Sequence, residues 1–144
     1  MIGSLDTFEY SCYLIRYALH SLTCYSLGTM EILIKDKKLK AGLEDQATRQ
    51  KLYGKDMAKK IRLRMEALTA AVSLVDLWPP MSGPERCHEL KGDMAGIFSV
   101  DVKQPYRLLF RATEALAIGS DVDEKQRWTS ITSIEIVNIK DTHG

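Results

Sequence analysis

The sequence lacks the short motifs of the common nucleotide-binding and hydrolytic enzymes. It contains no GxGxxG, no P-loop, no GxSxG and no HExxH, so the usual dinucleotide site, ATP site, nucleophilic serine and zinc-protease site are not expected. It has only three histidines and no Cys/His cluster at metal-ligand spacing, so a structural zinc site is not expected either. Any chemistry is therefore predicted to proceed without a metal or another cofactor.

Cysteine is also scarce. The three cysteines, Cys12, Cys24 and Cys87, form no CxxC pair and are odd in number, which favours a reducing cytoplasm over a disulfide scaffold. The chain has 144 residues, of which 45% are hydrophobic and 27% charged. This length and composition suffice for one packed domain and are typical of neither disordered nor membrane proteins.

Residues 1–29 are apolar and rich in aromatic side chains, yet they do not match a targeting segment. Two acidic residues stand where a signal peptide carries positive charge, and Arg16 and His20 interrupt the apolar run before it could span a bilayer. Two interpretations are open: a helix that docks on a partner or on the chain itself, or a true start of translation at Met30. We favour the second and expect no membrane association.

Residues 30–144 are expected to form the functional domain, which begins with a strand and two helices. The segment Glu31 to Lys35 is typical of a short strand. Apolar residues at every fourth position then predict a helix that ends before Gly54. A second helix is expected from Lys55 to the prolines at 79 and 80. Its apolar stripe consists of Met57, Ile61, Met65, Leu68, Val72 and Val75.

Basic residues are concentrated in this first part of the domain. Between positions 31 and 64 there are eleven Lys or Arg and five Asp or Glu, although the whole chain carries a net charge of only +1. Four of the basic residues lie off the apolar stripe of the second helix, namely Lys59, Lys60, Arg62 and Arg64. They form either a solvated helix face or a surface that contacts RNA phosphates, and both interpretations are open.

The segment from His88 to Ala112 predicts a short extended run, a turn with Gly92 and a β-hairpin. The two strands of the hairpin are expected at Ile97–Lys103 and Tyr106–Ala112, because apolar and polar residues alternate in both. A loop is expected at 113–127, followed by a last strand at 128–140. This last strand has apolar residues on both faces, which indicates a buried strand or one with a bulge. The order of elements predicts an α+β domain with one layer of helices on one sheet.

Polar residues near the hairpin and the last strand suggest a catalytic set. These residues are His88, Lys91, Arg107, Arg111, Asp141 and His143. Such a set suits RNA cleavage by the RNA's own 2′-hydroxyl, which needs a base, an acid and cations beside the phosphate. Histidine can fill either proton role near neutrality, and arginine binds phosphate oxygens in a fork. From the residues alone, ordinary structural roles for these side chains remain the open alternative.

The same residues resemble the HigB group of RelE-superfamily toxins, also known as plasmid-maintenance killer proteins. The resemblance covers residues 30–144 and is carried by H-x-L-K-G-D, a following Gly, an aromatic-S-x-x-V strand, a (W/Y)-R-(I/L)-x-F strand and a terminal D-x-H. The residues that match are His88, Leu90, Lys91, Gly92, Asp93, Gly96, Phe98, Ser99, Val102, Tyr106, Arg107, Leu108, Phe110, Asp141 and His143.

This resemblance implies a small RNase-like fold with two helices packed on a mostly antiparallel sheet. It implies ribosome-dependent cleavage of mRNA in the cytoplasm and neutralisation by an antitoxin, expected to be a HigA-like helix-turn-helix protein. By position, His88, Asp141 and His143 would form the acid–base group, and Lys91 and Arg107 would stabilise the phosphate. Arg111 is added from the strand pattern and not from the family motif.

Two features support a different interpretation, a RelE-like module that binds an antitoxin or RNA without cleaving it. Thr142 stands where the family has tyrosine, so a phenol that could stack on a base is absent. After position 29 there are 19 basic and 17 acidic residues, a net charge of only +2 for a protein expected to dock on ribosomal RNA. A third interpretation, the antitoxin itself, is disfavoured because we find no helix-turn-helix pattern.

Overall fold

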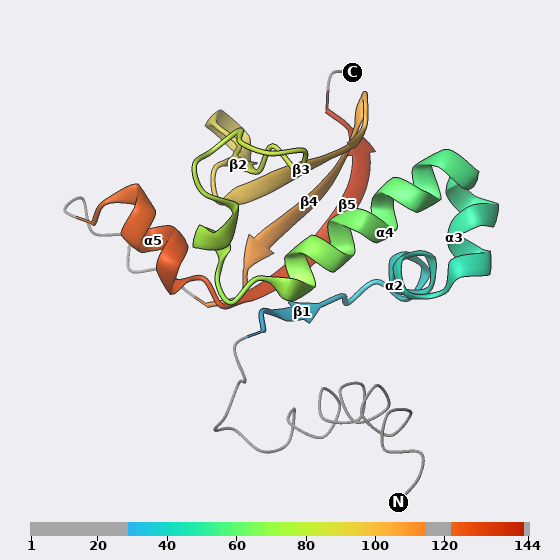
Figure 1. The fold of residues 1–144 in the computed structure, drawn as a ribbon, viewed down its shortest axis with the longest axis horizontal. Helices are drawn as coiled ribbons and strands as arrows, with labels where there is room; N and C mark the ends of the chain where they lie inside the picture. Colours follow the sequence, from blue (N-terminus) through green and yellow to red (C-terminus); the bar gives the residue numbers. More distant parts are fainter. Residues whose placement is uncertain (1–28, 115–121, 143–144) are drawn as a thin grey trace, which may run out of the picture.

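One mixed sheet organises the chain. The structure, a computed structural model, describes residues 29–114 and 122–142. Within these residues five strands form a sheet in the order β1-β5-β4-β3-β2 (Figure 1). The strands are β1 (Glu31–Leu33), β2 (His88–Glu89), β3 (Ile97–Lys103), β4 (Tyr106–Ala112) and β5 (Ser133–Asp141). The pairing of β1 with β5 is parallel and the other pairings are antiparallel, so the predicted α+β class with a mostly antiparallel sheet is confirmed.

Helices precede the hairpin and interrupt its connection to β5. They are α2 (Lys37–Glu44), α3 (Gln46–Tyr53), α4 (Lys55–Ala70) and α5 (Glu124–Ser130), with 3-10 turns η1 (Leu74–Leu77) and η2 (Gly92–Met94). The long helix α4 runs across the sheet, whereas α5 lies at the other end of the domain beside η1 (Figure 1). None of the helices in the described ranges is long and apolar enough to cross a membrane.

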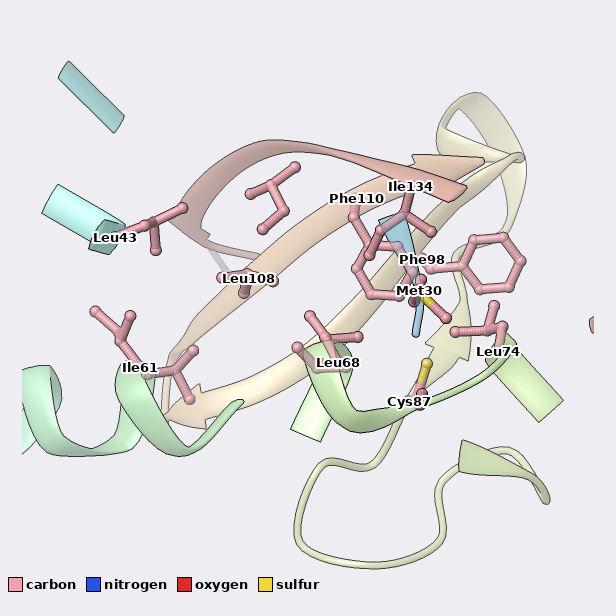
Figure 2. Close-up of a cluster of buried hydrophobic side chains, with 14 of the residues drawn as sticks. Met30, Leu43, Ile61, Leu68, Leu74, Cys87, Phe98, Leu108, Phe110 and Ile134 are labelled. Atoms are coloured by element: carbon pink, nitrogen blue, oxygen red, sulfur yellow. The ribbon is translucent and has the colours of Figure 1, made fainter. Parts of the chain in front are cut away.

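The core lies between α4 and one face of the sheet. Side chains of α4, such as Ile61 and Leu68, join Leu108 and Phe110 of β4 in one buried cluster (Figure 2). Phe98 of β3 stacks on Phe110 with ring centroids 5.6 Å apart. Because successive strand residues point to opposite faces, burial of these apolar residues turns the polar residues of β3 and β4 to the face away from α4.

The hairpin strands are confirmed with the predicted bounds, and both strand pairings of β4 contain an irregularity. In the β3–β4 pair the register shifts between Asp101 and Lys103, which makes Val102 the extra residue. In the β4–β5 pair it shifts opposite Leu109 and Phe110, where Val137 is the extra residue. The second shift explains why β5 has apolar residues on both faces, one of the two explanations expected from the sequence.

The predicted first helix is wrong in one respect, because the structure has two helices in its place. Asp45 separates α2 from α3, and its carboxylate accepts hydrogen bonds from the backbone N–H and the hydroxyl of Thr48, as an N-cap does. Gly42 allows the two helices to pack closely, since a Cβ there would lie 3.1 Å from Leu52 Cδ1 and 3.3 Å from the ring of Tyr53.

Two other predicted boundaries are corrected. Helix α4 ends at Ala70 and not at the prolines, so Val72 is outside it and 54% exposed. The last strand begins at Ser133 and not at Trp128, which instead lies in α5 and is fully buried against Trp78 and Phe98. Burial of the indole overrides the β-propensity of this segment. The expected extension at 1–29 lies outside the described residues except for its last one.

Candidate functional site

Arg107 lies in β4 on the sheet face away from α4. The register places it directly opposite Asp101 of β3 on one side and Lys140 of β5 on the other. Its Nε is 3.2 Å from Asp101 Oδ1, and the two side chains are 15% and 12% exposed. A sheltered carboxylate therefore forms an ion pair with the guanidinium that we expect to bind phosphate.

Asp101 is the centre of a larger cluster of charges. Arg86, in the loop before β2, places its Nε 3.7 Å from Asp101 Oδ2. Arg64 of α4 donates from Nε to the backbone oxygen of Asp101, and its Nη1 is 3.8 Å from Glu85 Oε1. The backbone N–H of Asp101 in turn donates to the carbonyl of Glu85 at 2.8 Å. We call Arg64, Glu85, Arg86, Asp101 and Arg107 the Asp101 cluster.

His88 lies on the same face as Arg107, two strands away. It pairs with Ser99, and Ser99 pairs with Leu109, so His88 is two strands and two residues from Arg107, roughly 12 Å between Cα atoms. Its Nδ1 is 2.8 Å from the backbone oxygen of Arg86. A carbonyl only accepts hydrogen bonds, so Nδ1 carries the proton and Nε2 is left to accept one in the neutral imidazole.

The other predicted catalytic residues lie at the ends of strands. Lys91 is exposed and precedes η2, three residues after His88. Asp141 pairs with Tyr106, so strand alternation turns it to the opposite face from Arg107, while Lys140 is the β5 residue beside that guanidinium. The end of β5 lies next to the tip of the hairpin (Figure 1). His143 lies outside the described residues.

Three of the four basic residues predicted on the second helix are exposed. Lys59, Lys60 and Arg62 lie on the solvent side of α4, where Arg62 donates to Glu66 one turn further on. Arg64 differs from them, because its side chain is 11% exposed and is bound within the Asp101 cluster. The expectation of an exposed Arg64 is thus corrected: this arginine attaches α4 to β3 and to the preceding loop.

Arg111 lies on the same face of β4 as Arg107 but belongs to a separate cluster. It pairs across strands with Glu135 and donates from Nη2 to Glu135 Oε2 at 3.2 Å. Lys35 Nζ is 3.1 Å from the same oxygen. Burial tends to raise the pKa of Glu135, but the hydrogen bonds and charges of Lys35 and Arg111 outweigh it and lower this pKa. We call these three residues the Glu135 cluster. A shallow hollow of about 510 Å³ opens beside it.

Cys87 lies between Arg86 and His88 in the chain, but its thiol is not expected to take part in the chemistry of the site. Its side chain is buried in the core, and burial together with the charge of Glu85 raises the pKa of the thiol to about 12. Such a thiol is protonated at neutral pH and is not a nucleophile. Within the described residues, no three His, Cys, Asp or Glu side chains gather closely enough to bind a metal ion.

Comparison with known families decides where the chain belongs. The sequence model of the family described as the RelE-like toxin of type II toxin-antitoxin system HigB matches residues 33–125, more than half of the chain. This chain is a HigB-like toxin. The predicted resemblance is therefore confirmed, and so is membership of the RelE-like toxins of type II toxin-antitoxin systems.

Solved structures show a weaker similarity to this HigB-like toxin. A YoeB/ParE toxin from Agrobacterium tumefaciens is 17% identical, covers 78% of this chain and 98% of that chain, and gives a TM-score of 0.45. The YoeB dimer from Staphylococcus aureus is also 17% identical, over 77% of this chain and 94% of that chain, with a TM-score of 0.43. No curated protein matches the chain. Family membership therefore rests on the sequence match.

Two residues of the candidate site were not predicted from the sequence. Asp101 was not named among the expected site residues, although it lies on the polar face of its strand and binds Arg107 in the structure. Arg86 lies in a loop outside the family motif. A signal for Asp101 was present in the hairpin: a two-residue loop without a bulge would pair Asp101 with Leu108 and Val102 with Arg107, so each pair would join a charged residue to an apolar one. A one-residue shift removes that conflict.

Proposed function

We propose that this HigB-like toxin is an endoribonuclease that cleaves mRNA on the ribosome without a metal ion. The observation that carries the proposal is the sheet face on which His88 and Arg107 lie together, with Arg107 held by Asp101. A base and an anion-binding group on one face are two of the groups that cleavage at a phosphate requires. The matched family motif supplies the class of substrate.

In the proposed reaction the RNA provides its own nucleophile. The Nε2 atom of His88 takes the proton from a 2′-hydroxyl, and the 2′-oxygen forms a bond to the adjacent phosphorus. The bond from phosphorus to the 5′-oxygen breaks, and His143 is proposed as the acid that protonates that oxygen. Asp141 is left out of this role because the strand turns it to the sheet face opposite Arg107. The products are a 2′,3′-cyclic phosphate and a 5′-hydroxyl. Lys91 and Arg107 neutralise the charge that develops on the phosphate oxygens.

Lys59, Lys60 and Arg62 are proposed to contact the RNA backbone or the ribosome from α4. Their exposure supports this role, and contacts of this kind release counterions and weaken with salt. Arg64 is left out of this surface because its guanidinium is engaged inside the domain. Arg111 is left out as well, because Glu135 binds it. The proposed protein partner is a HigA-like antitoxin with a helix-turn-helix domain.

Expression in bacteria and cleavage by purified protein test the function together. Wild type is expected to arrest growth and to cut mRNA on translating ribosomes, whereas His88→Ala and Arg107→Ala relieve the arrest. Chelation of transition metals with Mg²⁺ retained should leave cleavage unchanged. If wild type and both variants arrest growth equally, the proposed mechanism is wrong.

A binding module without nuclease activity is the second candidate, and Thr142 favours it. This threonine replaces the tyrosine of the family motif, and its hydroxyl oxygen is buried without a hydrogen-bond partner in the described structure. A protein of this kind would bind the antitoxin or RNA and leave mRNA intact. Cleavage of ribosome-bound mRNA by the wild-type protein would eliminate this candidate.

A further inference from the structure

Arg86 joins the two halves of the candidate site. Its backbone oxygen accepts from His88 Nδ1 at 2.8 Å, and its guanidinium Nε lies 3.7 Å from Asp101 Oδ2. The other oxygen of the same carboxylate is bound by Arg107. One residue outside the family motif therefore contacts the predicted base through its main chain and approaches the predicted phosphate-binding arginine through its side chain.

The backbone of Arg86 is held in a conformation that arginine rarely adopts. Its φ is 47°, in the left-handed region that favours glycine. The surrounding loop maintains this conformation, since the Arg86 N–H donates to the Ser82 carbonyl and the N–H of Met81 donates to the Cys87 carbonyl. A glycine would fit the backbone with less strain, but it would have no cation to place beside Asp101. Retained strain of this kind is found most often at functional positions.

The side chain of Arg86 is also accessible, unlike its neighbours in the cluster. It is 45% exposed, whereas Arg107 is 15% and Arg64 is 11% exposed. Two guanidiniums that share one carboxylate present two sets of donors to a common anion. A phosphodiester offers several oxygens for such a pair.

We propose that Arg86 is a second phosphate-binding residue of the site, acting beside Arg107 on the RNA strand. The identity of the ligand rests on the proposed ribonuclease function, whereas the cation pair itself rests on the geometry around Asp101. Arg86 contacts a phosphate of the bound RNA, and its main chain keeps the His88 imidazole oriented toward the same strand. Asp101 keeps the two guanidiniums together before RNA binds.

The test measures binding of a ten-nucleotide single-stranded RNA whose 2′-hydroxyls are methylated, so that cleavage by the 2′-oxygen is impossible. Full-length wild type is compared with Arg86→Gly and Arg86→Lys. Arg86→Gly should weaken binding roughly tenfold, since it removes a charged hydrogen bond. The slope of log Kd against log salt should fall by about 0.7, the value for one phosphate contact on a single strand. Arg86→Lys should lose less affinity and keep the slope.

Two variants are matched controls. Met81 is another non-glycine residue with positive φ, 65°, in the same loop, so Met81→Gly makes the same backbone change without removing a charge. Lys51→Gln removes an exposed charge from α3, away from the site. Both should bind the RNA as wild type does. The melting temperature of Arg86→Gly should stay near that of wild type, because glycine relieves strain as the ion pair is lost.

The outcomes separate this inference from the ribonuclease proposal. Weaker binding by Arg86→Gly alone, with an intact fold, supports the phosphate contact even if wild type cleaves no mRNA. Equal binding by wild type and Arg86→Gly overturns it, and so does equal weakening by Met81→Gly. Lack of any salt-dependent binding by wild type also overturns it. Should wild type cleave mRNA while Arg86→Gly binds normally, the ribonuclease proposal stands and only the role of Arg86 is wrong.

Discussion

Two arginines of β4, Arg107 and Arg111, lie on the same face of one strand and differ in almost everything else. Arg107 is 15% exposed and shares the carboxylate of Asp101 with a second arginine. Arg111 is 51% exposed and shares the carboxylate of Glu135 with Lys35. They are four positions apart along the strand, about 13 Å. Strand position alone therefore does not distinguish a candidate phosphate-binding arginine from one that closes a surface ion pair.

The two clusters differ in what surrounds the carboxylate. The Asp101 cluster connects α4, the loop before β2 and the hairpin, and His88 is attached to the same loop. The Glu135 cluster connects β4, β5 and the segment just after β1 by side chains at the surface of the sheet. The larger of the two described hollows opens at the Glu135 cluster, so concavity favours Arg111, whereas the convergence of elements far apart in the chain favours Arg107. Our proposal follows the convergence.

The largest expected effect is on the rate of mRNA cleavage, when Arg107 and Arg111 are replaced one at a time. Arg107→Ala is expected to lower the rate of mRNA cleavage by about 100-fold or more, as loss of a group that stabilises developing charge does. Arg111→Ala should change it by less than about threefold, because its charge lies beyond the screening length of about 8 Å at physiological ionic strength. Rates measured with translating ribosomes check both. Similar losses in the two variants would contradict the assignment of Arg107.

Neutralisation of the two carboxylates should affect stability unequally. Asp101→Asn leaves the sheltered guanidinium of Arg107 without its anion and should lower the free energy of unfolding by about 2 kcal/mol. Glu135→Gln should cost less than about 1 kcal/mol, since both of its cations are largely exposed. Urea denaturation at pH 7 measures both values. A larger loss of stability for Glu135→Gln than for Asp101→Asn would contradict the expectation that the Asp101 cluster contributes more to the free energy of unfolding.

The stability that Glu135 contributes to the fold should decrease as the pH falls. Its pKa is lowered in the folded state, so the stability it contributes is present above the unfolded-state pKa and disappears as the pH falls through the folded-state pKa. Wild type should thus be more stable than Glu135→Gln by a constant amount from pH 7 to 5. This advantage should shrink as the pH falls below the unfolded-state pKa and disappear once the pH is below the folded-state pKa. Melting curves across this range provide the measurement. An advantage that grows in acid would show that the pKa of Glu135 is not lowered in the folded state.

The smallest effect is expected for Lys35. Its side chain is 65% exposed, so Lys35→Gln should change the free energy of unfolding by less than about 0.5 kcal/mol, as is usual for exposed ion pairs. Raising the salt concentration should abolish even this difference. The comparison uses thermal melts of wild type and variant at two salt concentrations. A loss of stability as large as that of Asp101→Asn would contradict this prediction and show that the Lys35–Glu135 ion pair stabilises the fold.

Alternation of apolar and polar residues predicted much of this fold. The two hairpin strands were located to the residue, because apolar residues recur at every second position in Ile97–Lys103 and in Tyr106–Ala112. The α+β class and the family motif followed from the order of the elements and from local sequence. Errors occurred where tertiary contacts compete with local pattern: Trp128 is helical because its indole fills the core, and Asp45 divides a predicted helix because it caps the next one.

Only part of the candidate site was predicted, because local sequence does not show which separate elements come into contact. His88, Lys91 and Arg107 could be named because they belong to a contiguous motif, whereas Arg86 and Asp101 acquire their roles from contacts between separate elements. Arg64 shows the reverse case, since its position beside other basic residues suggested exposure while the fold uses it inside the domain.

The sequence by itself determined which residues of the hairpin face the core and which face away, because a side-chain period of two leaves only two choices. Only the tertiary structure decided which charged residues meet. The bulge at Val102 brings Asp101 opposite Arg107, and the loop before β2 adds Arg86 to the same carboxylate. The physical reason is that register and loop placement depend on how the whole sheet packs against α4, which no local pattern encodes.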